Sequence, residues 1–232
     1  MTDTALFSTL RRITTATITT VLLKKGIRRT WMKGPKMLRE GQARIAGRAF
    51  TLRFVPARED LATPASWSSP RSTRAAIEDM PEGCIAVIDA MGITDAGVFG
   101  DILAQRMAVR KVAGLVTDGA MRDVAGVLET GLPVWCAGAA APASVASLTF
   151  VGWQEPVGCG GCAIFPGDMI VADGDGAVVI PAALVEEVAK LGAEQEELEA
   201  WLMEEVKGGR ALPGLYPPNE ENLARYHARK KK

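Results

Sequence analysis

The stretch Ala113-Gly-Leu-Val-Thr-Asp-Gly-Ala-Met-Arg-Asp123 joins a short apolar run to a group of polar residues. Residues 113–116 have the length and apolar character of a strand that is buried on both faces of a sheet. In an open α/β sheet, ligands bind beyond the carboxyl ends of such strands. We therefore expect residues 117–123 to place Arg122 and Asp123 at the edge of a binding crevice.

The pattern of apolar strand and short helix continues on both sides of this stretch. Strands with the same character are predicted at 85–88 and 133–136, and helices at 101–110 and 124–129. Further strands are predicted at 49–55, 148–152, 169–172 and 177–180, the last two joined as a hairpin by the turn Asp173-Gly-Asp-Gly176. Apolar strands that alternate with helices predict an α/β fold whose sheet is covered on both faces.

Helices are also predicted at both ends of the chain. One or two short helices occupy residues 6–25, and a long helix begins near Pro181 and ends near Lys207. The apolar face of the long helix is extensive enough to cover the parent domain first and a neighbouring subunit later. We therefore expect one α/β domain over residues 1–183, followed over 184–232 by this helix and an extended arm.

The segment 62–74, Ala-Thr-Pro-Ala-Ser-Trp-Ser-Ser-Pro-Arg-Ser-Thr-Arg, is rich in Ser, Pro and Thr and is expected to be a mobile loop. Such a loop is either a lid over the site or a plain surface insertion. Its arginines Arg71 and Arg74, together with Arg53 on the preceding strand, are candidate contacts for a distal substrate carboxylate. The alternative is that these three arginines are solvated surface charges.

The 232 residues have the composition of an ordinary globular protein, with 48% apolar residues, 23% charged residues and a formal net charge of +0. A balanced charge gives no global attraction to nucleic acid or to anionic membranes. No stretch has the length of an apolar transmembrane helix, and the first residues lack the apolar core of a signal peptide. A cytoplasmic location is therefore expected.

Histidine is almost absent, since His227 is the only one in the chain. This argues against histidine-dependent triads and against metal sites with several histidines. A metal bound by this chain is expected to be a hard cation held by oxygen, Mg²⁺ or Mn²⁺ before Zn²⁺. The pair Cys159-Gly-Gly-Cys162 has the spacing of a redox or zinc pair, but it has no second pair and no nearby histidine.

Asp101 and the pair Arg122-Asp123 both stand where a glycine-containing turn leads into a predicted helix. The N–H groups and the dipole at the start of the helix from Asp101 suit the carboxylate of a small 2-oxo acid, although Asp101 could simply cap that helix. Arg122 offers a planar guanidinium to a carboxylate or an enolate, and Asp123 offers hard oxygen to Mg²⁺. The alternative for this pair is a structural salt bridge.

Together these residues resemble the 4-hydroxy-4-methyl-2-oxoglutarate aldolases, divalent-metal pyruvate aldolases that share a fold with the regulator of ribonuclease activity A. The resemblance covers roughly residues 6–208 and is carried by the motifs Gly100-Asp-Ile-Leu-Ala104, Gly114-Leu-Val-Thr-Asp-Gly-Ala-Met-Arg-Asp123, Leu132-Pro-Val134, Pro166-Gly-Asp168 and Asp173-Gly-Asp-Gly176. It implies a three-layer α/β/α sandwich like the phosphohistidine swivelling domain, with a C-terminal helical arm. It also implies a homotrimer or a dimer of trimers with active sites at subunit boundaries.

The resemblance gives the site residues separate roles. Asp123 is implied to be the one direct protein ligand of Mg²⁺, or of Mn²⁺ or another divalent cation, and Arg122 to clamp the substrate. Asp101 would touch the metal only through water, and a glutamate from a neighbouring subunit, Glu199 or else Glu196, would complete the outer shell. The backbone amides around the pyruvoyl carboxylate would be those of Gly100, Asp101, Ile102 and Leu103.

The implied activity is the aldol cleavage of a 4-hydroxy-2-oxo acid to pyruvate, with decarboxylation of oxaloacetate as a second reaction, within the catabolism of aromatic or sugar acids. A non-enzymatic regulator of ribonuclease activity, acting by protein binding, is the alternative from the same fold. The presence of both Asp101 and Asp123 favours the enzyme. RNA binding through the basic tail is a third and weaker hypothesis, because such tails are commonly solubilising ends.

Overall fold

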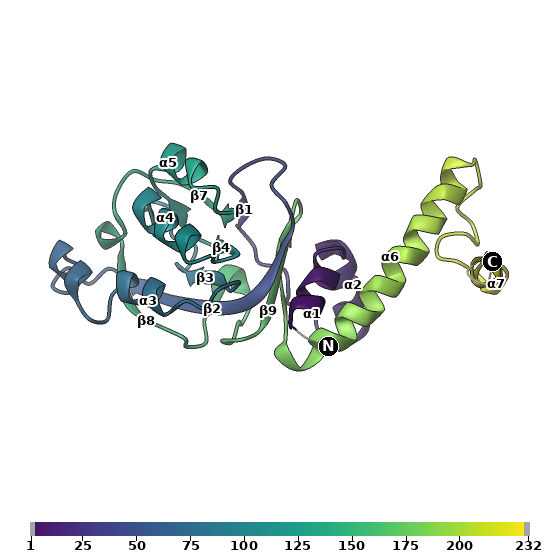
Figure 1. Cartoon of the computed structure of the whole chain (residues 1–232), viewed down its shortest axis with the longest axis horizontal. Coiled ribbons are helices and arrows are strands. Elements are labelled where there is room, and N and C mark those ends of the chain that lie inside the picture. The colour runs from purple at the N-terminus through teal and green to yellow at the C-terminus, as the bar shows by residue number, and fades with distance from the viewer. Residues whose placement is uncertain (1–2, 230–232) are drawn as a thin grey trace.

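The computed structural model describes residues 3–229 and contains a curled, eight-stranded mixed sheet with helices around it (Figure 1). The strand order is β1-β6-β4-β3-β2-β9-β10, and β8 also pairs with β2. The strands are β1 (Lys36–Met37), β2 (Ile45–Pro56), β3 (Ile85–Asp89), β4 (Gly114–Thr117), β6 (Val134–Cys136), β8 (Leu148–Trp153), β9 (Met169–Asp173) and β10 (Gly176–Ile180). The strands predicted from the sequence are therefore confirmed, and β9 and β10 form the predicted antiparallel hairpin.

The centre of the sheet is parallel, because β2, β3, β4 and β6 run side by side in the same direction. Along β3 the side chains alternate between two cores: Ala86 and Ile88 join one, whereas Ile85 and Val87 join the other. Both sets are fully buried. The central strands are thus covered on both faces, as their uninterrupted apolar sequences predict.

One face of the parallel strands packs against helices α3 (Thr73–Asp79), α4 (Asp101–Val109) and α5 (Val124–Glu129) (Figure 1). The opposite face is covered largely by the chain's own curled strands, with Trp135, Ile170 and Val179 in one buried cluster together with Ile164. The α/β class is confirmed as a mixed sheet that curls on itself. The closer likeness to a phosphohistidine swivelling domain stays a prediction.

The long helix α6 (Val185–Lys207) begins on the sheet and projects away from it (Figure 1). Its first turns pack with α1 (Asp3–Leu10), α2 (Thr15–Lys24) and strands β9 and β10 in a third apolar cluster. The far end of α6 buries Trp201 and Leu202 against Leu215 and Tyr226. The predicted helical arm is therefore present, with a small core of its own at its tip.

The prediction of an extended arm after α6 is wrong for residues 220–229, because they form helix α7 (Glu220–Arg229). The Asn219 side chain caps it by accepting a 3.0 Å hydrogen bond from the Asn222 N–H, and Tyr226 tilts over the Trp201 ring at 5.6 Å between centroids. The sequence did not predict this helix, because the segment is highly charged and has too few apolar residues to show a helical pattern. Residues 230–232 of the basic tail lie outside the described residues.

The segment 62–74 also contains more regular structure than expected. Residues Pro64–Ser68 form a short 3-10 helix, η1, and α3 begins at Thr73 with the Ser72 hydroxyl accepting a hydrogen bond from the Ala75 N–H. Short helical turns therefore form despite the Ser- and Pro-rich composition, because serine and proline suit the starts of helices. Within residues 3–229, no helix is long and apolar enough to cross a membrane.

Candidate active site

Three loops meet beyond the carboxyl ends of β3, β4 and β6. A small second sheet joins two of them, since β5 (Ala120–Met121) pairs in parallel with β7 (Gly138–Ala139). Gly97, on the loop after β3, bridges to both neighbouring loops, at Ala120 and Ala143. The predicted crevice at the strand ends therefore has walls that are tied together by backbone hydrogen bonds.

Two glycines let the loop after β3 lie directly on Arg122 and Asp123. A Cβ atom at Gly97 would stand 2.6 Å from the Arg122 Cβ, and one at Gly100 would stand 2.5 Å from Oδ2 of Asp123. The Arg122 N–H donates a 3.0 Å hydrogen bond to the Phe99 carbonyl in the same contact. Any larger side chain at either glycine would push the loop and the Arg122-Asp123 pair apart.

Asp123 occupies the left-handed region, with φ 50° and ψ 42°, and is the residue before α5. Its carboxylate makes no capping bond to that helix; instead Oδ2 accepts a 3.0 Å hydrogen bond from Nε of Arg122. The side chains of Arg122 and Asp123 are 35% and 44% exposed, so both charged groups remain accessible to solvent. Unusual backbone geometry at a residue whose carboxylate points to solvent is typical of a binding site rather than of a simple cap.

Asp101 is the first residue of α4, and Gly100 is its N-cap with extended backbone. Oδ1 of Asp101 accepts a 2.7 Å hydrogen bond from the Ile102 N–H, so that this amide is occupied by the chain's own carboxylate. The Asp101 side chain also lies close against Gly126 of α5, where a Cβ would stand 2.8 Å from Oδ2. The N-terminus of α4 therefore faces the site with a carboxylate at its rim and with the Ile102 N–H already bonded.

These residues line one hollow of about 320 Å³. The sequence-predicted members that it brings together are Gly100, Asp101, Ile102, Leu103, Arg122 and Asp123. Trp67 and Thr73 also line the hollow and come from the segment 62–74, for which a lid and a surface insertion were the two expectations; Ser144 lines it as well, and no sequence motif marks that residue. Of the three candidate arginines for a distal carboxylate, only Arg74 lines this hollow.

The residues present fit a hard divalent cation better than zinc. No group of three or more His, Cys, Asp or Glu side chains suited to a metal occurs within residues 3–229. A cation beside Asp123 would then take most of its ligands from water and substrate, as Mg²⁺ commonly does. Zn²⁺ instead needs a nearly complete set of protein ligands.

Glu196 and Glu199 lie on α6, away from the hollow of their own chain. Oε1 of Glu196 accepts hydrogen bonds from the N–H and hydroxyl of Thr14, at 2.7 and 2.9 Å. Burial alone would raise the pKa of Glu196, but the Thr14 hydrogen bonds bring the pKa below its ordinary value. Glu196 therefore joins α6 to the start of α2, whereas Glu199 accepts a hydrogen bond from Gln195 and is otherwise available.

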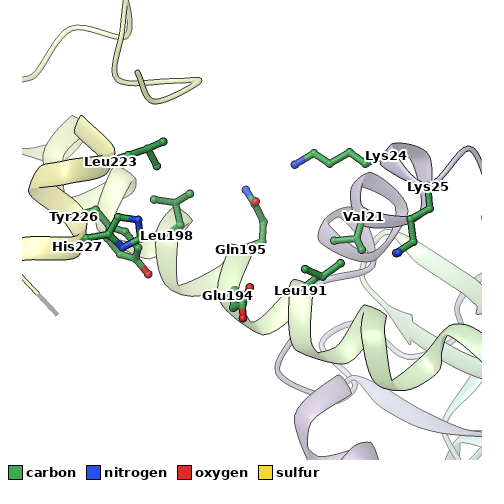
Figure 2. A pocket seen from close by; sticks show the side chains of 10 residues that line it. All are labelled: Val21, Lys24, Lys25, Leu191, Glu194, Gln195, Leu198, Leu223, Tyr226 and His227. Atoms are coloured by element: carbon green, nitrogen blue, oxygen red, sulfur yellow. The ribbon is translucent and has the colours of Figure 1, made fainter. Parts of the chain in front are cut away.

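A larger hollow, of about 750 Å³, lies along α6 between α2 and α7 (Figure 2). Val21, Leu191, Leu198 and Tyr226 give it an apolar lining, with Lys24 facing it from α2. It contains none of the residues Asp101, Arg122 and Asp123. Size alone therefore does not mark the site, and we assign the chemistry to the smaller hollow at the strand ends.

The Cys159–Cys162 pair is not arranged for redox or zinc chemistry in the described part of the chain. Both cysteines are free and buried. Burial raises the pKa of Cys159 well above its ordinary value and that of Cys162 to about 11. The Cys162 thiol donates a hydrogen bond to the Trp31 carbonyl, at 3.2 Å from sulfur to oxygen. The pair serves as packing in the core.

Asp118 holds the backbone of the loop after β3 in place, a role that the sequence motif around it did not predict. Its carboxylate accepts backbone hydrogen bonds from Ala90 at 2.8 Å, Gly92 at 3.1 Å and Gly160 at 3.0 Å. Burial raises the pKa of Asp118 in spite of these bonds. Asp118 thereby fixes the first turn of the loop that leads from β3 to α4 and contains Gly97 and Gly100.

The family profile described as "RraA-like: Aldolase/RraA" matches residues 15–179, which include every element that builds this hollow. The chain belongs to the RraA-like family. Among solved members, Streptomyces coelicolor RraAS2, described as an unusual member of the RNase ES inhibitor RraA protein family, is 36% identical. It superposes with a TM-score of 0.77, covering 86% of this chain and 96% of that one.

Curated RraA-like relatives carry different names. A protein of Halalkalibacterium halodurans named "Putative 4-hydroxy-4-methyl-2-oxoglutarate aldolase" is 35% identical over 141 residues, 59% of this chain and 66% of that protein. Protein DlpA of Legionella pneumophila is 33% identical over 153 residues, 66% of this chain and 24% of that protein. The chain thus spans a quarter of one relative and just under two thirds of the other. The family contains proteins named as aldolases and proteins named as RNase inhibitors.

Proposed function

We propose that this protein is a Mg²⁺-dependent carbon–carbon lyase that cleaves a 4-hydroxy-2-oxo acid related to 4-hydroxy-4-methyl-2-oxoglutarate and releases pyruvate. The observation that carries this assignment is the convergence of Asp101, Arg122 and Asp123 on one hollow at the N-terminus of α4. The aldolase names of several RraA-like relatives support it. Mn²⁺ or another divalent cation can replace Mg²⁺ at a site made of oxygen ligands.

Cleavage of the bond between C3 and C4 leaves an electron pair that must be delocalised into the C2 carbonyl. Arg122 is suited to this task, because its guanidinium can stand beside the C2 oxygen where negative charge develops. The N–H groups that begin α4 and are not already bonded to Asp101 are suited to the C1 carboxylate. Asp123 would hold the cation, which when bound supplies Lewis-acid stabilisation to the same oxygen.

The reaction also moves one proton. The C4 hydroxyl must lose its proton as the C3–C4 bond breaks and the C4 carbonyl forms, and C3 must gain a proton to become the methyl group of pyruvate. Asp101, at the rim of the hollow, would orient a water molecule for both transfers. With oxaloacetate, carbon dioxide would leave in place of the carbonyl fragment, and the same charge would develop at the C2 oxygen.

We place the assembly in the same proposal. A homotrimer or dimer of trimers would bring Glu199 from a neighbouring copy to the rim of the hollow, as the family resemblance implies. The projecting helix α6 supports this arrangement, because its far half extends beyond its own domain (Figure 1). A cytoplasmic setting in the catabolism of aromatic acids completes the proposal.

A non-enzymatic role as a regulator of ribonuclease activity is the alternative. It is favoured by the description of the structural relative RraAS2 as a member of an RNase inhibitor family. Such a role would need no Asp101, Arg122 and Asp123 set facing a hollow. A regulator would therefore bind its partner equally well when Asp123 is replaced.

The deciding experiment is a coupled pyruvate-release assay with 4-hydroxy-4-methyl-2-oxoglutarate and with oxaloacetate. The protein freed of metal by a chelator is compared with the same protein after Mg²⁺ is added back. We expect pyruvate release that depends on Mg²⁺. Release that is equally fast without any divalent cation would refute the mechanism, and no release from either substrate would favour the regulator.

A further inference from the structure

We propose that Arg74 binds the distal carboxylate of the substrate and is the residue by which the site distinguishes a dicarboxylic from a monocarboxylic 2-oxo acid. This inference rests on the proposed lyase function. It concerns the half of the substrate that Arg122 and Asp123 do not reach. Its basis is the position, the partners and the charge of Arg74.

Arg74 projects from the first turn of α3 into the same hollow as Arg122. Its guanidinium lies 5.2 Å from the centre of the Trp67 ring, and Trp67 belongs to the short helix η1. A cation over an indole face is held in place without being neutralised. Arg74 is thus oriented by Trp67 while its hydrogen-bond donors stay free for an anion.

Arg74 differs from the two neighbouring arginines, because both of those form ion pairs with a glutamate. Arg71 forms a 2.8 Å ion pair with Glu155 and also donates to the Val151 carbonyl, and Arg53 lies 3.7 Å from the same glutamate. Neither of them lines the hollow. Within residues 3–229, no acidic side chain forms an ion pair with Arg74. Arg74 is therefore the arginine of this region whose charge is left for a ligand.

The two guanidiniums of the hollow match two separate groups of one kind of substrate, the C2 oxygen at Arg122 and a second carboxylate at Arg74. Arg122 is beside Asp123, whose negative charge offsets its own, whereas Arg74 adds a positive charge with no acidic partner. An arginine fork recognises a carboxylate through two parallel hydrogen bonds. A 2-oxo acid whose C1 carboxylate is held at α4 would present its second carboxylate to Arg74.

The test compares two substrates that share the pyruvoyl half. 4-Hydroxy-4-methyl-2-oxoglutarate carries the second carboxylate on C4, and 4-hydroxy-2-oxopentanoate has a hydrogen atom in its place. The variant Arg74→Met removes the charge and keeps much of the length of the side chain. The control is Arg71→Met, which removes another exposed arginine of the same segment from outside the hollow.

We expect Arg74→Met to raise KM for the dicarboxylate by about 10- to 100-fold, as the loss of a charged hydrogen-bonded pair does. The kcat for the dicarboxylate and both constants for the monocarboxylate should change little. Arg71→Met should leave the ratio of kcat/KM between the two substrates as it is in the native chain. A circular dichroism melt of each variant verifies that it is folded.

Two results would overturn the inference while the proposed function stands. One is a native enzyme that releases pyruvate from both substrates with equal kcat/KM. The other is an Arg74→Met variant in which the two substrates are affected equally or not at all. Absence of pyruvate release from both substrates by the native chain would refute the lyase function itself, and the assignment of Arg74 with it.

Discussion

Arg122 donates a hydrogen bond of 3.0 Å from Nε to Oδ2 of Asp123, the next residue in the chain, whose backbone is in the left-handed region. Adjacent residues rarely meet in this way, because extended or helical backbone directs successive side chains apart. The left-handed turn at Asp123 brings the two side chains together. A cation ligand and an anion clamp can therefore act on one small substrate.

Replacing Asp123 with Asn should abolish most of the activity without unfolding the protein. Asn keeps the size of the side chain and tolerates left-handed backbone, but it lacks the charge that holds a divalent cation. We expect kcat/KM to fall by about 100-fold or more, with a melting temperature close to that of the native chain. Pyruvate release and a thermal melt measure both, and a fully active Asp123→Asn protein would contradict the assignment.

Replacing Gly100 with Ala should impair the site through a single methyl group. The added Cβ would stand 2.5 Å from Oδ2 of Asp123, so the carboxylate must move. Because a displacement of about 1 Å can reduce the rate about 100-fold, we expect a loss of that order in kcat. The control is Gly138→Ala, since a Cβ at Gly138 meets nothing within 4 Å. Equal activities of the two variants would show that the close approach is unimportant.

The strand ends and the polar residues beyond them were predictable from the sequence for one physical reason. Apolar runs fixed β3, β4 and β6 as buried parallel strands, and the carboxyl ends of parallel strands share one edge of the sheet. Arg122 and Asp123 were therefore expected at a crevice; the family resemblance implied that Asp101 shares their site, and the three line one hollow. The strands could be predicted from the sequence because each of them is determined by its own local run of apolar residues.

Other features were not predictable because distant residues create them. Helix α7 is held in place by the packing of the Tyr226 ring against the Trp201 ring, and the charged sequence of the tail does not predict this contact. The place of Arg74 depends on Trp67 in a segment whose composition indicated only a loop. The need for glycine at 97 and 100 appears only when the loop after β3 is seen against Arg122 and Asp123.

The cysteines should resist modification in the folded protein. Burial raises the pKa of Cys84 to about 12 and that of Cys162 to about 11, and it raises the pKa of Cys136 and Cys159 as well. Thiolate is the reactive form, so each thiol should react more slowly than a free cysteine at about pH 8, by about 100-fold or more at Cys84 and Cys162. Ellman's reagent should titrate all four thiols only after denaturation. Rapid labelling of a thiol in the native protein would contradict this packing.

Replacing Glu196 with Ala should destabilise the junction of α2 and α6 in a pH-dependent way. The hydrogen bonds from Thr14 lower the pKa of Glu196 beneath its ordinary value of 4.5. Its contribution to stability is therefore fully present above that value and is lost as the pH falls through the folded-state pKa. We expect a loss of about 1–2 kcal/mol near pH 7 that shrinks as the pH falls through the folded-state pKa. Urea unfolding of both proteins from about pH 7 downward measures the difference, with Glu194→Ala, at an exposed glutamate of the same helix, as the control. A difference that does not vary with pH would contradict the role of the carboxylate.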